Sequence, residues 1–350
     1  MFRILIFTGF FLVLLGRGIA QDNPASDTSR PVNREAIAAY NRAVELMDQG
    51  LTDAAIERLN LALKKDERIG PAWYNLALLY SGQERFDEAL QAIDKALEND
   101  DNADYLMARG FIELQTGKSG LAAETLSRVT HKDRENFSGW YFLGLAREAA
   151  GDDTGAKQAL IRSVDLRQDF APGWFELGWL LWESGDTDQA ETDLLKCVDL
   201  DPSISEAYLL LGMINQEKGN PAKAGEYFTT ACRLSPESVT PFMLRGLWYF
   251  QTDELEKAAD DFSVAIENSK GMAGAYNNRA VVRYHMGELE QSLKDFTAAC
   301  TSSPEFSDAY VNRGILKEVI RDLKGACADW QKAGESGNMK AIEYLAESCN

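Results

Sequence analysis

Three arginine and aspartate pairs recur at a fixed spacing near the end of the sequence. An aspartate follows each arginine by sixteen residues, in the pairs Arg245 and Asp261, Arg279 and Asp295, and Arg313 and Asp329. An arginine facing a carboxylate can belong to a catalytic or ligand-binding site, or it can form a salt bridge between two antiparallel helices. Because regular recurrence is more typical of a scaffold than of a site, we expect three structural salt bridges.

The two histidines, His131 and His285, have no serine or cysteine partner at a recognisable spacing. The sequence also has no glycine loop that would cradle a phosphate and no H-E-x-x-H pattern. Both histidines are therefore interpreted as ordinary side chains. We expect no enzyme activity, no catalytic residue, no metal and no cofactor.

The five cysteines form no C-x-x-C pair, so zinc or haem attachment is not expected. Cys197 replaces a small residue, and Cys232 and Cys300 occupy equivalent places that are too far apart to be bridged. Cys327 and Cys349 should reach the same end of a final helix pair. They would then form either a disulfide that closes 22 residues or two free thiols, and the sequence leaves both alternatives open.

The charge balance excludes one class of partner. The chain has a formal net charge of −19, and without its first twenty residues, which contain two arginines, the balance is 34 − 55 = −21. Nucleic-acid binding needs a cationic face that releases counterions from phosphates, so we expect no nucleic-acid partner.

Residues 1–20 have the three parts of a secretory signal: a basic start at Arg3, an apolar run, and small residues at the end. The apolar run is shorter than the roughly 20 residues that span a bilayer, although an uncleaved anchor is the alternative. We expect cleavage after Ala20, export to the periplasm or the exterior, only indirect contact with a membrane, and a flexible polar leader over residues 21–35.

The rest of the sequence repeats one unit with a period of 34 residues, once 33. The expected repeats are 36–69, 70–102, 103–136, 137–170, 171–204, 205–238, 239–272, 273–306 and 307–337. The eighth place of every repeat is a small residue, and the twenty-fourth place is a large apolar one. Such a pattern predicts pairs of helices that approach closely at the small residue and bury their apolar faces by stacking on neighbouring pairs.

The chain resembles the tetratricopeptide repeat family. The resemblance rests on segments such as residues 72–77 with 86–89, and 173–178 with Ala190 and Pro202. It implies an all-α fold in which antiparallel helix pairs form a right-handed superhelical solenoid with a concave groove. Residues 338–350 fit a C-terminal capping helix, with Met339, Ile342 and Leu345 facing inward and Lys340 and Glu343 facing outward.

The resemblance also implies that six places of each repeat face the groove: the second, fifth, sixth, ninth, twelfth and thirteenth. Family members that grip acidic C-terminal tails have basic residues there, but none of these places is Lys or Arg in this sequence. An acidic tail is therefore disfavoured as a partner. Leu145, Leu209 and Leu247 are interpreted as packing between neighbouring helices.

The remaining groove positions suggest a protein-binding surface. Asparagine amides can hold a peptide backbone, and aromatic and Met side chains can anchor an apolar segment. We expect the partner-binding residues to be Asn41, Asn75, Phe111, Tyr141, Phe175, Trp179, Trp182, Met213, Met243, Phe250, Asn278 and Asn312.

The sequence thus predicts a non-enzymatic scaffold of the cell envelope that binds an extended or amphipathic protein segment in its groove. Two alternatives remain open at this point. The same groove could bind a hydrophobic or glycan small molecule, or it could mediate self-assembly.

Overall fold

The computed structural model describes residues 33–269 and 271–349. These residues are helical apart from short connections and contain no β-strand. The expected signal sequence, and the expected leader up to residue 32, lie outside the described residues.

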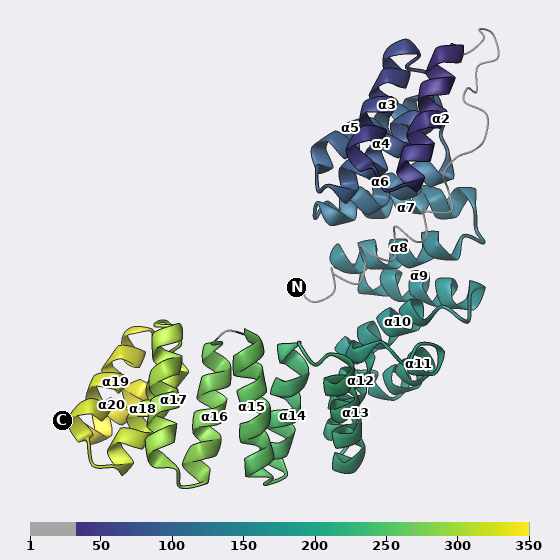
Figure 1. Cartoon of the computed structure of the whole chain (residues 1–350). Coiled ribbons are helices and arrows are strands. Elements are labelled where there is room, and N and C mark those ends of the chain that lie inside the picture. Colours follow the sequence, from purple (N-terminus) through teal and green to yellow (C-terminus); the bar gives the residue numbers. More distant parts are fainter. Residues whose placement is uncertain (1–32, 270, 350) are drawn as a thin grey trace. The chain divides into compact units, whose positions relative to one another are not determined.

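Two kinds of helix alternate along the described chain (Figure 1). The first helices are α2 (Arg34–Asp48), α4 (Gly70–Gly82), α6 (Ala103–Gln115), α8 (Phe137–Ala149), α10 (Ala171–Glu183), α12 (Ser205–Glu217), α14 (Val239–Gln251), α16 (Ala273–His285) and α18 (Ser307–Val319). The second helices are α3 (Thr52–Lys65), α5 (Phe86–Asn99), α7 (Ser119–Lys132), α9 (Asp153–Leu166), α11 (Thr187–Leu200), α13 (Pro221–Leu234), α15 (Leu255–Ser269), α17 (Leu289–Ser302) and α19 (Leu323–Glu335). A final helix, α20 (Met339–Ser348), follows α19.

The chain divides into two compact units, Met1–Leu180 and Leu181–Asn350. In the described part of the N-terminal unit, α2 to α9 pack as consecutive antiparallel pairs. In the described part of the C-terminal unit, α12 to α19 pack in the same way, and α20 packs on α19. Each unit is therefore an all-α stack of helical hairpins.

The first helices from α4 to α18 begin at the residues where the sequence places the starts of repeats. Helix α2 begins two residues before the expected start at Ala36. The Asn33 Oδ1 atom accepts a hydrogen bond from the Glu35 backbone N–H at 2.9 Å, and this N-cap extends the helix.

The turn inside a helix pair needs a residue with positive φ. Most turns use glycine, for example Gly151 with φ of 82°. In three repeats without a turn glycine, Glu84, Asp253 and Arg321 adopt φ values of 58°, 63° and 68°. The helix pair thus imposes the left-handed turn even where the side chain disfavours it.

The small eighth-place residue lets the two helices of a pair touch. A Cβ atom placed on Gly144 would lie 2.7 Å from Cγ of Leu160, and one placed on Gly212 would lie 2.6 Å from Cε1 of Phe228. Both large side chains are 0% exposed. The complementary small and large residues therefore set how closely each pair packs.

Tryptophan side chains fasten the connections between repeats in the N-terminal unit. The indole N–H groups of Trp73, Trp140 and Trp174 donate to the backbone carbonyl six residues earlier, at distances of 2.9–3.0 Å. Each bond satisfies a carbonyl in the connection that precedes a first helix. The large fourth-place residue thus fixes where the next repeat starts.

The capping helix α20 packs on α19 with part of the face that the sequence indicated. Leu345 packs on the core cluster that contains Trp330, and Lys340 and Glu343 are exposed, as expected. Met339 is 66% exposed, so the expectation that it faces inward is wrong, and Ile342 lies beside Gly334 of α19 but is still 43% exposed. Ala341 is buried instead, and the Tyr344 ring stacks on the Trp330 ring with centroids 5.0 Å apart. Contact with this large ring orients the helix more strongly than burial of Met339 would.

Cys327 and Cys349 form a disulfide that joins α19 to the end of α20. The bridge spans 22 residues, so in the chain-entropy model its removal should cost about 3 kcal/mol. We expect the double variant Cys327→Ser with Cys349→Ser to show faster hydrogen exchange in α20. Ser348→Ala, which loses only a 3.2 Å hydrogen bond to Glu318, is the control. Equal rates of hydrogen exchange in α20 of both variants would contradict a stabilising role of the disulfide.

Candidate binding surface

The three expected arginine and aspartate pairs are salt bridges that join the two helices of one repeat. In each pair, two guanidinium N–H groups donate to the two carboxylate oxygens at distances of 2.7–2.8 Å. Arg279 also donates to Ser263 on the preceding second helix at 2.9 Å. The side chains of Asp261, Asp295 and Asp329 are each 6% exposed. The geometry therefore ties helices together and leaves no open carboxylate for a ligand.

The histidines and free thiols do not form a reactive group. His131 and His285 are both exposed and lie on different helices, α7 and α16. Cys232 and Cys300 are buried, and burial raises the pKa of Cys232 to about 12 and that of Cys300 to about 11. Both thiols therefore stay protonated and are poor nucleophiles at neutral pH. The described residues also include no cluster of His, Cys, Asp and Glu side chains that could hold a metal ion.

In the N-terminal unit, most of the expected partner-binding residues are buried. Asn75 is 0% exposed, and Phe111, Tyr141 and Phe175 are at most 5% exposed. The Phe111 ring meets Phe142 on the next first helix edge to face, with centroids 5.8 Å apart. These four residues therefore offer no open contact surface in this structure, which corrects their expected role.

Asn41 and Trp179 are the expected binding residues of this unit that reach the surface. Asn41 is exposed on α2, and Trp179 is partly exposed on α10, with its ring centroid 6.4 Å from that of Phe175. In the C-terminal unit, Trp182 is also partly exposed on α10.

The C-terminal unit carries the remaining expected residues on its first helices. Met213, Met243, Phe250, Asn278 and Asn312 are all partly exposed. They come from four successive first helices, α12, α14, α16 and α18. These five residues are therefore accessible to a partner, and their role in binding stays a prediction.

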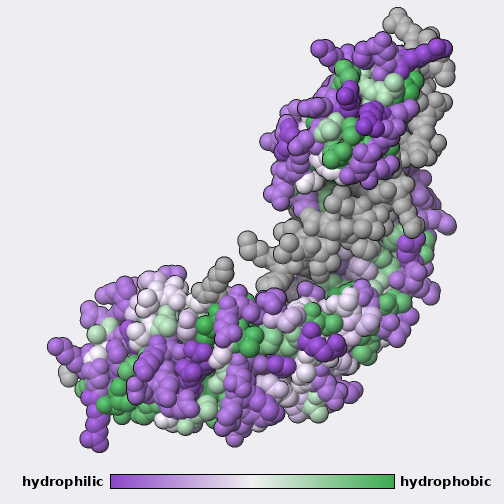
Figure 2. Space-filling view, in the orientation of Figure 1, coloured by the Kyte–Doolittle hydropathy of each residue, from purple (hydrophilic) through white to green (hydrophobic). Residues whose placement is uncertain are grey.

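The structure adds residues that the sequence analysis did not select. Leu247, interpreted as a packing residue, is 38% exposed, whereas Leu145 and Leu209 are 7% and 9% exposed. Val281, Tyr284, His285 and Ile315 join the row. We call the whole set the first-helix face; it comprises Met213, Met243, Leu247, Phe250, Asn278, Val281, Tyr284, His285, Asn312 and Ile315. Figure 2 shows hydrophobic patches between hydrophilic ones on the visible side of the C-terminal unit.

A recess of about 180 Å³ lies in the first-helix face between α16 and α18. Its lining residues are Val281, Tyr284, His285, Phe296, Asn312, Ile315 and Leu316. Phe296 comes from the second helix α17 and is 2% exposed, so it belongs to the core beneath the recess. The His285 ring also meets the Phe250 ring of α14, with centroids 5.2 Å apart, and this contact links the recess to the neighbouring repeat.

Amide groups lie beside the apolar side chains. The Asn312 Nδ2 atom donates to Asn277 Oδ1 at 2.9 Å, and Asn277 Nδ2 donates to Asn278 Oδ1 at 3.4 Å. An asparagine side chain has two donor hydrogens and a carbonyl oxygen with two lone pairs, so this chain orients the amides and leaves further bonding capacity. Oriented amides next to an apolar recess can bind both the backbone and one side chain of a peptide.

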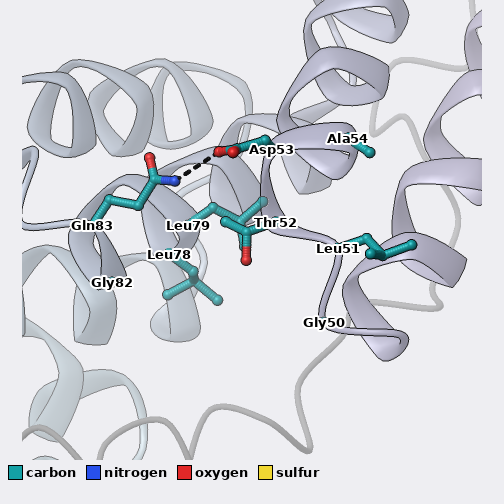
Figure 3. A pocket seen from close by; sticks show the side chains of 9 residues that line it. All are labelled: Gly50, Leu51, Thr52, Asp53, Ala54, Leu78, Leu79, Gly82 and Gln83. Atoms are coloured by element: carbon teal, nitrogen blue, oxygen red, sulfur yellow. Dashed lines mark hydrogen bonds between the residues drawn. The ribbon is translucent and has the colours of Figure 1, made fainter.

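Two larger recesses occur in the N-terminal unit. One, of about 720 Å³, lies between the α2–α3 turn and the end of α4, where the Gln83 side chain donates to Asp53 at 3.0 Å (Figure 3). The other, of about 460 Å³, lies over α4 and is lined by residues of the second helices α3 and α5. Neither contains an expected binding residue.

A protein-family model described as Tetratricopeptide repeat matches residues 70–102 of the sequence. A second family model with the same description matches residues 107–169 and 175–239. Over 71 residues the chain is 39% identical to a TPR repeat-containing protein of Pseudomonas aeruginosa. The matching segment covers 20% of this chain and 68% of that protein. Over 87 residues it is 32% identical to a TPR repeat-containing protein of Methanocaldococcus jannaschii; this is 25% of the chain but only 15% of the archaeal protein.

The fold is similar to that of solved helical-repeat proteins. A tetratricopeptide repeat protein from Parabacteroides merdae superposes with a TM-score of 0.52 at 20% identity, over 71% of this chain and 99% of that one. At this identity the similarity concerns the fold alone. None of the described helices has both the length and the apolar character that crossing a lipid bilayer requires.

Proposed function

The chain belongs to the tetratricopeptide repeat family, and from that premise we propose that it is a non-enzymatic scaffold that binds a protein segment on its first-helix face. The observation that supports this most strongly is the juxtaposition of partly exposed apolar side chains and oriented amides on successive first helices. Exposed apolar groups that adjoin hydrogen-bonding groups are typical of a surface that holds a peptide.

The apolar part of the face supplies the affinity. Leu247 is 38% exposed, and Met213, Met243 and Phe250 are partly exposed next to it in repeat register. Methionine and aromatic side chains adapt to the shape of a partner and gain free energy when they are desolvated. The asparagines beside them would satisfy the polar backbone of the bound segment, so that its N–H and C=O groups lose no hydrogen bond on burial.

The size of the recess favours a protein partner over a small molecule. Pockets for drug-sized ligands enclose roughly 300–1,000 Å³ and bury most of the ligand. The recess between α16 and α18 has about 180 Å³, which suits one side chain of a longer segment. We therefore place the binding of a small molecule on the first-helix face second.

We extend the proposal to an exported protein of the cell envelope or the exterior. Support comes from the basic, apolar and small-residue order of residues 1–20 and from the Cys327–Cys349 disulfide. Disulfides persist in oxidising compartments and are rare in the reducing cytosol. We expect the intact mass of the mature protein to correspond to a chain that begins at Gln21.

Leu247→Ser combined with Ile315→Ser tests the binding face. Both side chains lie on the first-helix face, so their loss should weaken capture of the native partner at least about tenfold while the helix content stays unchanged. The control is Leu195→Ser, because Leu195 is 42% exposed but lies on the second helix α11. Affinity capture with quantitative mass spectrometry measures the loss. Equal capture by all three proteins would contradict the proposal.

A further inference from the structure

The charges of the first helices in the C-terminal unit are unevenly distributed. Every Lys and Arg of α12, α14, α16 and α18 is in an ion pair: Arg245 with Asp261, Arg279 and Arg283 with Asp295, and Arg313 and Lys317 with Asp329. Their partners lie on second helices, so these cations are turned away from the first-helix face. The face itself carries no Lys or Arg.

Carboxylates at the margin of the face lack cationic partners. Glu206 and Glu217 lie on α12, and Asp308 and Glu318 lie on α18, at the second, twelfth or thirteenth places of their repeats. Within the described part of the chain, none of the four makes an ion pair. The Asn338 side-chain amide donates a hydrogen bond to Asp308 at 3.0 Å, and the Ser348 hydroxyl donates one to Glu318 at 3.2 Å; both donors are neutral. The negative charge of these carboxylates is therefore uncompensated.

Two of these carboxylates lie on α18, the helix that supplies Asn312, Ile315 and Leu316 to the recess. Asp308 lies four residues before Asn312 on α18, and Glu318 lies three residues after Ile315. Residues separated by three or four positions are neighbours on a helix surface, so Asp308 lies next to Asn312 and Glu318 next to Ile315, two residues that line the recess. Ten residues separate the two, which corresponds to about 15 Å along the helix. An extended segment covers that distance in about five residues.

The recess is mostly apolar and has the size of one large side chain. Its volume is about 180 Å³, and a closed protein cavity of about 150 Å³ lined by apolar groups is sufficient to bind benzene. Val281, Ile315 and Leu316 form apolar walls, and the core residue Phe296 lies beneath. A Phe, Leu or Ile side chain would therefore be buried there with good contact.

Building on the proposed function, we propose that the bound segment is cationic and apolar: one Phe, Leu or Ile enters the recess, and Lys or Arg side chains on either side pair with Asp308 and Glu318. The uncompensated carboxylates would repel an acidic segment and attract a basic one. The apolar residue would supply most of the affinity, and the basic residues would select the partner.

The test uses three nine-residue fluorescent peptides and the full chain. The first peptide has a central Phe with Lys two places to either side; the second has Glu in place of both Lys residues; the third has Ala in place of Phe. Fluorescence anisotropy at low ionic strength should give a Kd for the first peptide that is at least about tenfold lower than for the other two. The difference from the Glu peptide should shrink in about 0.5 M NaCl, where screening is strong.

Variants separate charge from fold. Asp308→Asn combined with Glu318→Gln preserves side-chain size and should abolish the preference for Lys over Glu. Glu256→Gln on α15, an exposed site on a second helix, should leave the preference intact. Equal binding of the Lys and Glu peptides to the unaltered protein would overturn this inference. So would capture of the native partner through Leu247 and Ile315 without any binding of the Lys peptide, although the proposed function would then stand.

Discussion

Trp330→Ala is expected to destabilise the C-terminal unit by about 3–5 kcal/mol, the largest effect of any single truncation considered. The Trp330 side chain is 0% exposed and stacks on Tyr344 of the capping helix. Its indole N–H donates to the Val311 carbonyl at 3.3 Å. A Cβ atom at Gly314 would lie 2.3 Å from Nε1, so the ring fills all the space beside that glycine. Truncation would leave a cavity that joins α18, α19 and α20.

Urea unfolding followed by circular dichroism measures the loss for Trp330→Ala. Trp174→Ala is the matched control because Trp174 is only partly buried, and we expect it to cost less than half as much. Trp330→Phe separates the indole hydrogen bond from the packing, and should retain most of the stability. Equal destabilisation by the Trp330→Ala and Trp174→Ala variants would contradict the assigned role of Trp330.

Asp295→Ala should have the second largest effect. The carboxylate of Asp295 accepts two hydrogen bonds from Arg279 at 2.8 Å and one from Arg283 at 2.7 Å. Hydrogen bonding to Asp295 raises the pKa of Arg279. Because a guanidinium stays protonated in proteins even without such a partner, Arg279 remains charged when Asp295 is removed. Because Arg279 is 15% exposed and Arg283 is 24% exposed, both would be left in a poorly hydrated place. Breaking a fully buried pair costs about 3–5 kcal/mol, and because both arginines are partly exposed we expect a loss of about 3 kcal/mol, at the lower end of that range.

Thermal unfolding and peptide binding should be measured together for Asp295→Ala. We expect a lower Tm and unchanged affinity for any segment bound by the first-helix face, since the Asp295 side chain is turned away from that face. Lys294→Ala is the control, because Lys294 is exposed and pairs only with the exposed Glu290. Loss of binding at full stability would instead assign Asp295 to a ligand site and refute the structural interpretation.

The sequence determined the fold well because the signal was repeated. A small residue such as Gly144 opposite a large one such as Leu160 is weak alone, but the same pair recurs in register along the chain. The salt bridges were predictable for the same reason, since an arginine and an aspartate at a constant separation meet wherever the helix pair recurs.

The capping helix shows where periodicity becomes ambiguous. Helix α20 is only ten residues long, and apolar residues occur on more than one side of it. Either Met339 or Ala341 with Tyr344 could face α19. Contact between Tyr344 and Trp330 decides between them, and that contact depends on the position of a residue in another helix.

The binding surface was only partly predictable because the place in a repeat does not determine exposure. Leu145 and Leu247 occupy the same place, yet one is 7% and the other 38% exposed. The fifth place of the repeat after that of Leu145 is Phe175. The fifth place of the repeat after that of Leu247 is Asn277, which has a shorter side chain. A longer side chain at that neighbouring place is expected to cover more of the leucine. Exposure therefore depends on pairs of residues in adjacent repeats rather than on one position.

Site-specific photocrosslinking tests the proposed binding face most directly. A benzophenone side chain is placed at Leu247, at Ile315 or, as the control, at Leu195, and the protein is irradiated in its native compartment. The proposed face predicts that one partner is crosslinked from Leu247 and Ile315, with the adducts mapped to a single segment of that partner, and not from Leu195. Crosslinking of the partner from Leu195 at an equal or higher yield would show that the first-helix face is not where it binds.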